Sequence, residues 1–337
     1  MDKKKLAETA LALVANDKGL LAMDESNPTC NKRFAKLGIP QTVEMRQAYR
    51  ELIVTTPGLN EALSGAILAD ETIHQQKKDG TPFAKALTDL GIIPGIKVDA
   101  GAKTLALHPD EKITEGLDGL RERLQEYVKL GARFAKWRAV ITIGNNIPSP
   151  VCLEANAEAL ARYAALCQEA GLVPIVEPEV LMDGSHTLEQ CYKVTEATLK
   201  EVFHHLSLHG VLLEGMLLKP NMVVPGLECP KQESVDELAE ATIKCLSHTV
   251  PVAVPGIVFL SGGQSSEDAS ARLNAMNVKF KSKVPWAISF SFARAIQQPA
   301  LDLWKGQEAN VKDAQKALYK QAKDNLEARK GLFKGKK

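Results

Sequence analysis

Eight short apolar stretches recur along the chain, and each ends in or next to a charged or hydroxyl-bearing residue. Apolar runs of this length, bounded by Gly and Pro, are typical of buried β-strands. In order along the chain they are Gly19–Asp24, Gly65–Asp70, Gly95–Asp99, Ala132–Arg138, Val173–Glu177, Gly215–Lys219, Pro255–Ser261 and Pro285–Ser291. Segments with a helical period lie between them, such as residues 154–170 and 233–247, which are rich in strong helix formers.

The alternation of strand and helix predicts an α/β fold with a parallel sheet, because parallel neighbours need right-handed crossovers. Eight units in 337 residues give about 42 residues each, which suits a (β/α)8 TIM barrel with eight parallel strands. A doubly wound sheet is the alternative, but no G-x-G-x-x-G motif opens a first helix. No internal linker is evident, so we predict one barrel domain over residues 1–327. A mobile Lys- and Gly-rich tail is expected over residues 328–337.

Composition excludes several classes of function. The net charge is +1, from 42 Lys and Arg against 41 Asp and Glu, so no overall field favours nucleic acid. No apolar run approaches the ~18 residues of a membrane span, and the N-terminal residues form no secretory apolar region. Six scattered cysteines without a C-x-x-C motif fit a reducing compartment. We therefore expect a cytoplasmic protein with neither a nucleic-acid nor a membrane partner.

Charged residues of both signs lie at the carboxyl ends of the predicted strands, where barrel enzymes carry their chemistry. Side chains two residues apart on a strand share a face, so these groups are expected to point together into the barrel mouth. Alone, each could be a structural ion pair, but together they indicate an active site. The six residues expected to converge are Asp24, Lys97, Lys136, Arg138, Glu177 and Lys219. By the same spacing Asp99 shares a face with Lys97, and Glu179 shares a face with Glu177.

Lys219 is the most unusual of these residues, because it ends a buried apolar run and Pro220 follows it. Lysine is almost never buried unless it is paired. Its amine could reach solvent or pair with a carboxylate. Alternatively, burial and neighbouring cations could keep the amine neutral often enough to attack a carbonyl and form a Schiff base. In that case Glu177 could carry protons during imine formation, and Asp24 could do further proton work or bind a substrate hydroxyl.

Anion-binding patterns follow the first, seventh and eighth predicted strands. After the seventh, Gly262 and Gly263 could turn their amides inward ahead of a helix expected over residues 269–276, where Ser265 and Asp268 form an S-x-x-D capping box. Such a Gly-Gly pair could also be only a turn. Arg294, after the eighth strand, would supply a cation for the same anion. The Lys32-Arg33 pair could hold a second phosphate or be solvated surface. His204, His205 and His209 lack the H-E-x-x-H pattern, so we predict no catalytic metal.

With these residues in place, the chain resembles the class I fructose-bisphosphate aldolases, the metal-free Schiff-base kind, from about residue 6 to about residue 325. The motifs that carry the resemblance are long and ordered along the chain. They are LLAMDESN (20–27), GIKVD (95–99), GARFAKWR (131–138), GLVPIVEPE (171–179), LEGMLLKPNM (213–222), FLSGGQS (259–265) and SFSFARA (289–295).

The resemblance implies reversible cleavage of fructose 1,6-bisphosphate to dihydroxyacetone phosphate and glyceraldehyde 3-phosphate, with no cofactor beyond the covalent imine. By matching motif, Lys219 is the Schiff-base lysine, Glu177 its acid/base, Asp24 the group acting at the C4 hydroxyl and Lys136 an aid to carbinolamine formation. The implied substrate-binding residues are Lys97 as a substrate-contacting cation, Ser261, Gly262 and Arg294 for the C1 phosphate, Ser26 and Arg138 for the far phosphate, and Lys32 and Arg33 as further candidates. The family also implies a homotetramer acting in glycolysis and gluconeogenesis.

The chain departs from the family pattern in places. Many members end in a tyrosine that helps to protonate the enamine, but the last tyrosine here is Tyr319, so that step stays unassigned. Ala100 stands where many members have lysine, and Ala293 where animal members have glycine. The alternatives are a Schiff-base lyase for another phosphosugar, such as sedoheptulose 1,7-bisphosphate or fructose 1-phosphate, a non-catalytic phosphosugar or polyanion binder, and a metal-dependent aldolase.

Overall fold

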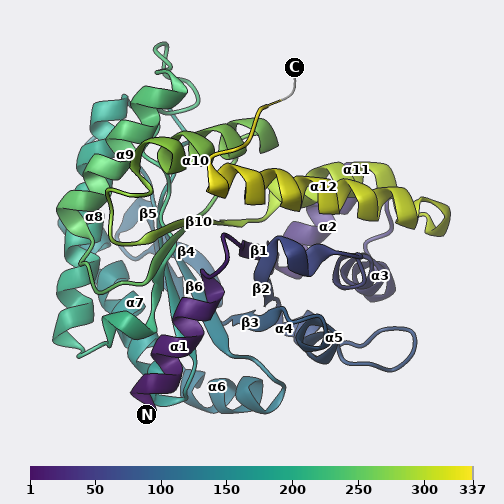
Figure 1. The fold of residues 1–337 in the computed structure, drawn as a ribbon. Coiled ribbons are helices and arrows are strands. Elements are labelled where there is room, and N and C mark those ends of the chain that lie inside the picture. The colour runs from purple at the N-terminus through teal and green to yellow at the C-terminus, as the bar shows by residue number, and fades with distance from the viewer. Residues whose placement is uncertain (336–337) are drawn as a thin grey trace.

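The computed structural model describes residues 1–335 and contains a closed barrel of eight parallel strands with helices packed around it (Figure 1). This confirms the predicted (β/α)8 TIM barrel. Around the ring the strand order is β1-β10-β9-β8-β7-β6-β3-β2. The barrel strands are β1 (Gly19–Met23), β2 (Leu63–Leu68), β3 (Ile93–Lys97), β6 (Phe134–Ile141), β7 (Val173–Val180), β8 (Leu217–Leu218), β9 (Gly256–Phe259) and β10 (Ala287–Phe292).

Each predicted apolar stretch contains or overlaps one barrel strand, but the lengths differ. β6 and β7 run on to Ile141 and Val180, past the predicted ends, because all eight residue pairs between them stay in register. β8 is only two residues long. The Lys219 N–H nevertheless donates to the Val176 carbonyl at 2.8 Å, so the ladder continues to the lysine itself. Lys219 is therefore held by backbone pairing at the end of its strand.

The helices alternate with the strands and form the outer layer (Figure 1). The predicted helical segments 154–170 and 233–247 correspond to α7 and α9. The helix bounds are α1 (Lys3–Leu13), α2 (Asn27–Ala35), α3 (Val43–Val54), α4 (Asp70–Ile73), α5 (Phe83–Asp89), α6 (Leu120–Lys129), α7 (Pro150–Glu169), α8 (Leu188–Leu208), α9 (Val235–Thr249), α10 (Ser266–Phe280), α11 (Arg294–Trp304) and α12 (Val311–Lys330).

The helix after the seventh barrel strand, α10, begins at Ser266, three residues earlier than predicted. The Ser265 hydroxyl caps it by accepting the Asp268 N–H at 3.0 Å. The predicted capping box is only half formed. The Asp268 carboxylate accepts the Ser265 hydroxyl at 2.7 Å, and no bond from the Ser265 backbone to Asp268 is present among the described residues.

A hairpin that the sequence patterns did not predict follows β3. Its strands are β4 (Gly101–Leu105) and β5 (His108–Glu115), which pair antiparallel. The Thr114 hydroxyl donates to the Arg138 carbonyl at 2.8 Å and so ties the hairpin to β6 at the barrel mouth. At Gly116, with φ at 127°, an added Cβ would lie 2.7 Å from the Ala100 nitrogen, so glycine is required where the hairpin closes.

The amino-terminal end of the barrel is filled with apolar side chains. Leu6, Ala10 and Leu13 of α1 pack in one cluster with Phe134 and other inward residues of the strands. This end of the barrel therefore contributes stability rather than chemistry. The polar strand ends lie at the opposite mouth.

The C-terminal residues lie against α10. Helix α12 continues to Lys330, and Ala328 and Arg329 are buried, so the helix extends three residues into the predicted tail 328–337. The Phe333 N–H donates to the Asn274 side chain at 3.0 Å. Residues 336–337 lie outside the described residues, and the mobility of the tail stays a prediction. Within residues 1–335 no helix is long and apolar enough to cross a membrane.

Gly95 offers a test of the packing below the mouth. A Cβ added at Gly95 would overlap the Phe134 ring. We expect Gly95→Ala to lower the free energy of unfolding by about 1–3 kcal/mol, the usual cost of overpacking, as measured by denaturant titration. A second substitution, Phe134→Leu, should recover part of that loss. If the losses of unfolding free energy from the two single substitutions simply add in the double variant, the Phe134 ring is not what excludes a side chain at position 95.

Candidate active site

A cavity of about 960 Å³ opens at the carboxyl ends of the barrel strands. Every residue proposed from the sequence as catalytic or substrate-binding lines it. These residues are Asp24, Ser26, Lys32, Arg33, Lys97, Lys136, Arg138, Glu177, Lys219, Ser261, Gly262 and Arg294. The predicted strand faces explain this convergence. Ala135 and Trp137 of β6 pack into the helix layer, while Lys136 and Arg138 turn into the cavity.

Four buried charges of alternating sign form a chain across the floor of the cavity. The Lys219 amine lies 3.3 Å from Glu177 Oε1, and the Lys136 amine lies 3.1 Å from Glu177 Oε2. The Lys136 amine also lies 2.7 Å from Asp24 Oδ2. Each of these side chains is less than one-tenth exposed. Lys219 and Asp24 directly follow β8 and β1, while Glu177 and Lys136 lie on β7 and β6, so only barrel closure brings the four residues together.

The chain fixes the charges of its members. Burial raises the pKa of Asp24, but the Lys136 and Lys219 amines outweigh it and lower that pKa to about 2. Burial lowers the pKa of Lys136, yet Asp24 and Glu177 more than offset this, so its pKa lies well above the usual value. Asp24 is therefore an anion and Lys136 a cation over the whole working pH range.

The Lys219 amine is buried and has a proton acceptor beside it, because Glu177 Oε1 lies 3.3 Å away. The neutral nucleophile proposed from the sequence stays a prediction. A proton passed from the amine to Glu177 would produce it without solvent.

A second ion-paired group lies on the β3 and β6 side of the mouth. The Lys97 amine lies 2.7 Å from Asp99 Oδ1, and the Arg138 Nε donates to Glu179 Oε2. Burial lowers the pKa of Arg138, but Glu179 more than offsets this and holds it above its usual value. The period-two pattern placed Asp99 and Glu179 on the inward face, but gave neither of them a role.

The Gly-Gly turn and Arg294 meet on the β9 and β10 side. Gly262 and Gly263 have φ values of 58° and 103°, which side chains rarely adopt, so both glycines are needed here. A Cβ at Gly263 would lie 3.5 Å from Arg294 Nη2, so the guanidinium lies over the turn. Together with the buried Ser261 at the start of the turn, this arrangement can bind an anion.

The residues of α2 differ in their availability. Arg33 is buried, forms an ion pair with Glu25 and donates to Gln298 at 3.2 Å. Glu25 also pairs with Arg50 at 2.9 Å. Arg33 would have to leave these partners to bind a phosphate, whereas Lys32 is exposed at the rim. The phosphate roles of both residues stay predictions.

The sequence patterns gave no role to four further residues with polar side chains that line the cavity. Glu25 directly follows Asp24, and Ser291 ends the eighth apolar stretch. Both could have been proposed from their position at the carboxyl end of a predicted strand. Thr29 lies one helical turn after Ser26, and their hydroxyls are 3.0 Å apart. Lys36 lies one helical turn after Lys32, and no sequence pattern apart from its charge indicated that it lines the cavity.

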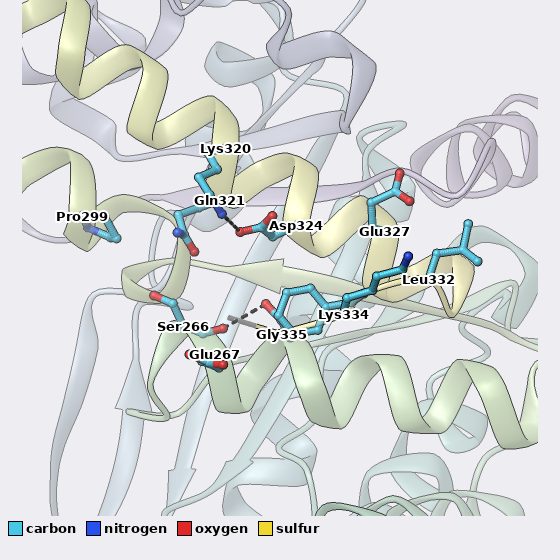
Figure 2. Close-up of a pocket in the computed structure, with 12 residues that line it drawn as sticks. Ser266, Glu267, Pro299, Lys320, Gln321, Asp324, Glu327, Leu332, Lys334 and Gly335 are labelled. Atoms are coloured by element: carbon cyan, nitrogen blue, oxygen red, sulfur yellow. Dashed lines mark hydrogen bonds and ion pairs between the residues drawn. The ribbon is translucent and has the colours of Figure 1, made fainter. Parts of the chain in front are cut away.

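A second, smaller hollow of about 320 Å³ lies between α10, α11, α12 and the C-terminal segment and shares no described lining residue with this cavity (Figure 2). Lys320 and Asp324, which line it, pair with each other at 2.6 Å. None of the residues proposed for the site is among the described residues that line it. It is therefore not a candidate for the chemistry.

The cavity is lined by amines and carboxylates. Within residues 1–335 no group of three or more His, Cys, Asp or Glu residues is placed to hold a metal ion. The six cysteines are buried and free.

Fold and cavity together define a (β/α)8 barrel with a buried lysine set among carboxylates at its mouth. A family model described as class-I fructose-bisphosphate aldolase matches residues 5–337, and the chain belongs to that family. It is therefore an aldolase.

Relatives match over nearly the whole chain. A probable fructose-bisphosphate aldolase class 1 from Xanthomonas campestris pv. campestris is 59% identical, covering 99% of this chain and 100% of that protein. The cytosolic fructose-bisphosphate aldolase 6 of Arabidopsis thaliana is 54% identical, with coverage of 94% and 88%. A solved structure of fructose-bisphosphate aldolase from Plasmodium falciparum, in complex with TRAP and a small-molecule inhibitor, is 47% identical. It superimposes with a TM-score of 0.97 and coverage of 99% and 96%.

The depressed pKa of Asp24 links this residue to acid stability. Its carboxylate is stabilised in the folded state, so its contribution is present above the ordinary pKa of 3.8 and is lost as pH falls towards 2. That contribution is of the order of 2 kcal/mol. We expect Asp24→Asn to be less stable than the parent at pH 6 and the difference to shrink towards pH 3, as measured by urea unfolding at several pH values. A constant difference would contradict this linkage.

Proposed function

We propose that the protein reversibly cleaves fructose 1,6-bisphosphate to dihydroxyacetone phosphate and glyceraldehyde 3-phosphate through a Schiff base on Lys219. The observation that carries the proposal is the position of this lysine between two anion-binding groups on opposite sides of the ring. In the strand order, β9 and β10 lie directly across from β3 and β6. A ketose with a phosphate at each end fits that span. The names of the relatives, both fructose-bisphosphate aldolases, support the same substrate.

The first half of the reaction forms the imine. The neutral Lys219 amine attacks the C2 carbonyl while the C1 phosphate is bound by Ser261, Gly262 and Arg294. The carbonyl oxygen takes up a proton, and the resulting carbinolamine loses water with Glu177 supplying the second proton. Lys136, a fixed cation beside Glu177, stabilises negative charge on that oxygen. The product is a protonated imine at C2.

The second half breaks the C3–C4 bond. The bonding electrons move to C3 and into the protonated imine, which acts as the electron sink, while the C4 hydroxyl loses its proton and becomes the aldehyde. Asp24 accepts that proton. Because a carboxylate with a pKa of about 2 is a weak base, the proton moves as the bond breaks and the hydroxyl becomes acidic. Protonation of C3 stays unassigned, and water then hydrolyses the imine.

The wider setting belongs to the same proposal. The imine supplies the electron sink, so no cofactor and no metal is required. The free cysteines and the relative described as cytosolic support a cytoplasmic location. Family membership supports a homotetramer that acts in glycolysis and gluconeogenesis.

Trapping tests the central step. Borohydride added with dihydroxyacetone phosphate should reduce the imine to a stable adduct that peptide mapping locates on Lys219. Lys219→Met should give no adduct. Excess chelator in the assay should leave turnover unchanged, since no step uses a metal. Label on another lysine, or no label, would falsify the proposal. Competition kinetics with fructose 1,6-bisphosphate and sedoheptulose 1,7-bisphosphate shows for which of the two kcat/KM is higher.

Glu177 is expected to act on the rate rather than on binding. Glu177→Gln keeps the shape of the side chain but removes the acid/base, so kcat should fall by about 10²–10⁴-fold, the usual size of a general acid–base effect. KM should change far less. Steady-state kinetics separates the two, and a change confined to KM would count against the proposed role.

A further inference from the structure

Asp99 has a defined position at the mouth but no role in the steps above. It follows β3, and only 2% of its side chain is exposed. Its carboxylate meets three donors. Oδ1 lies 2.7 Å from the Lys97 amine and accepts the Gly101 N–H at 3.1 Å. Oδ2 accepts the Arg138 N–H at 3.3 Å.

These contacts join three elements around one buried charge. Lys97 belongs to β3, Gly101 opens the hairpin, and Arg138 lies on β6. The Lys97 amine also donates to the Asp99 carbonyl at 2.8 Å, so this residue holds the amine from two sides. A free lysine side chain samples many rotamers and loses that freedom when it binds an anion. A lysine side chain that is already held in place loses less conformational entropy when it binds an anion.

Asp99 is not placed to take part in the chemistry directly. The proposed imine-forming lysine directly follows β8, and its proposed proton donors lie on β7 and β6, whereas the Asp99 carboxylate faces Lys97 and backbone N–H groups. Its charge does act on the neighbouring cations. After the larger effects of burial and of nearer carboxylates, it contributes to holding the pKa values of Lys136 and Arg138 above their usual range.

We propose that Asp99 is a positioning residue for the second phosphate. It holds the Lys97 amine and the Arg138 backbone on the side of the mouth opposite the Gly-Gly turn, and so sets the preference for a ketose with two phosphates over one with a single phosphate. The proposal rests on the proposed function, because it assumes that the C1 phosphate binds at Ser261 and Gly262.

Asp99→Asn tests this with two substrates. The amide oxygen can still accept the Gly101 N–H, but the charge that holds Lys97 is lost. We expect kcat/KM for fructose 1,6-bisphosphate to fall by about tenfold to a hundredfold, the range for loss of a hydrogen bond to a charged group. The loss should appear in KM. The loss with fructose 1-phosphate, which has no second phosphate, should be several times smaller.

The matched control is Asp89→Asn. Asp89 also pairs with a lysine at 2.7 Å, but this pair with Lys85 is exposed on α5, outside the cavity. The control should match the parent enzyme with both substrates. It reports what removing a Lys–Asp pair does anywhere on the protein.

A double substitution shows whether Asp99 acts through Lys97. In a Lys97→Met background, Asp99→Asn should lower kcat/KM for the bisphosphate by a much smaller factor than it does in the parent enzyme. Equal losses with both sugars, or additive losses in the double variant, would overturn the proposal and leave Asp99 a purely structural residue.

Borohydride trapping separates this outcome from failure of the proposed function. Asp99→Asn should still trap dihydroxyacetone phosphate on Lys219, because that ketone needs only the C1 phosphate side. If the parent enzyme forms no adduct, the proposed function fails. If the parent and the variant both form the adduct, but the ratio of their kcat/KM values for fructose 1,6-bisphosphate and fructose 1-phosphate is the same, only the proposed role of Asp99 fails.

Discussion

The buried chain of Lys219, Glu177, Lys136 and Asp24 is the constraint on which the mouth depends. A charge removed from water is costly unless an opposite charge and hydrogen bonds compensate it. Here each inner member compensates its two neighbours, so two amines and two carboxylates can be buried together. In the proposed reaction the same arrangement places the nucleophile, Lys219, beside a proton acceptor, Glu177. Removing any one member therefore changes both the charges and the chemistry of the others.

The closed barrel makes such a chain possible. Its members lie on strands that are separate in the sequence, and parallel pairing brings the carboxyl ends of these strands to one level. At the opposite end of the barrel the interior is filled by apolar side chains of α1 and by Phe134. Because stability is concentrated at one end, polar groups can be concentrated at the other. The alternating faces of each strand connect the two, since Trp137 packs outwards while Lys136 and Arg138 project inwards.

Sequence reasoning reached the fold and the inward faces because both follow from local periodicity. Lys97 and Asp99 could be placed on one face from their spacing alone. Pairing could not be deduced in the same way. That Arg33 is held by Glu25, and that Glu177 faces Lys219, depends on how separate elements meet in space. The hairpin after β3 was missed because its strands are exposed and lack the apolar runs that marked the barrel strands.

The two sides of the mouth to which we assign the phosphates differ in how far carboxylates already compensate their cations. In the proposed reaction this difference affects the order of product release. Lys97 and Arg138 already have the carboxylates of Asp99 and Glu179 beside them, so their charges are partly compensated within the protein. Arg294 has no such partner among the residues that the structure describes, and it faces a turn of backbone amides. In the proposed reaction the fragment near Arg294 also stays covalently bound to Lys219. The aldehyde, whose phosphate lies on the internally compensated side, is therefore the fragment free to leave first.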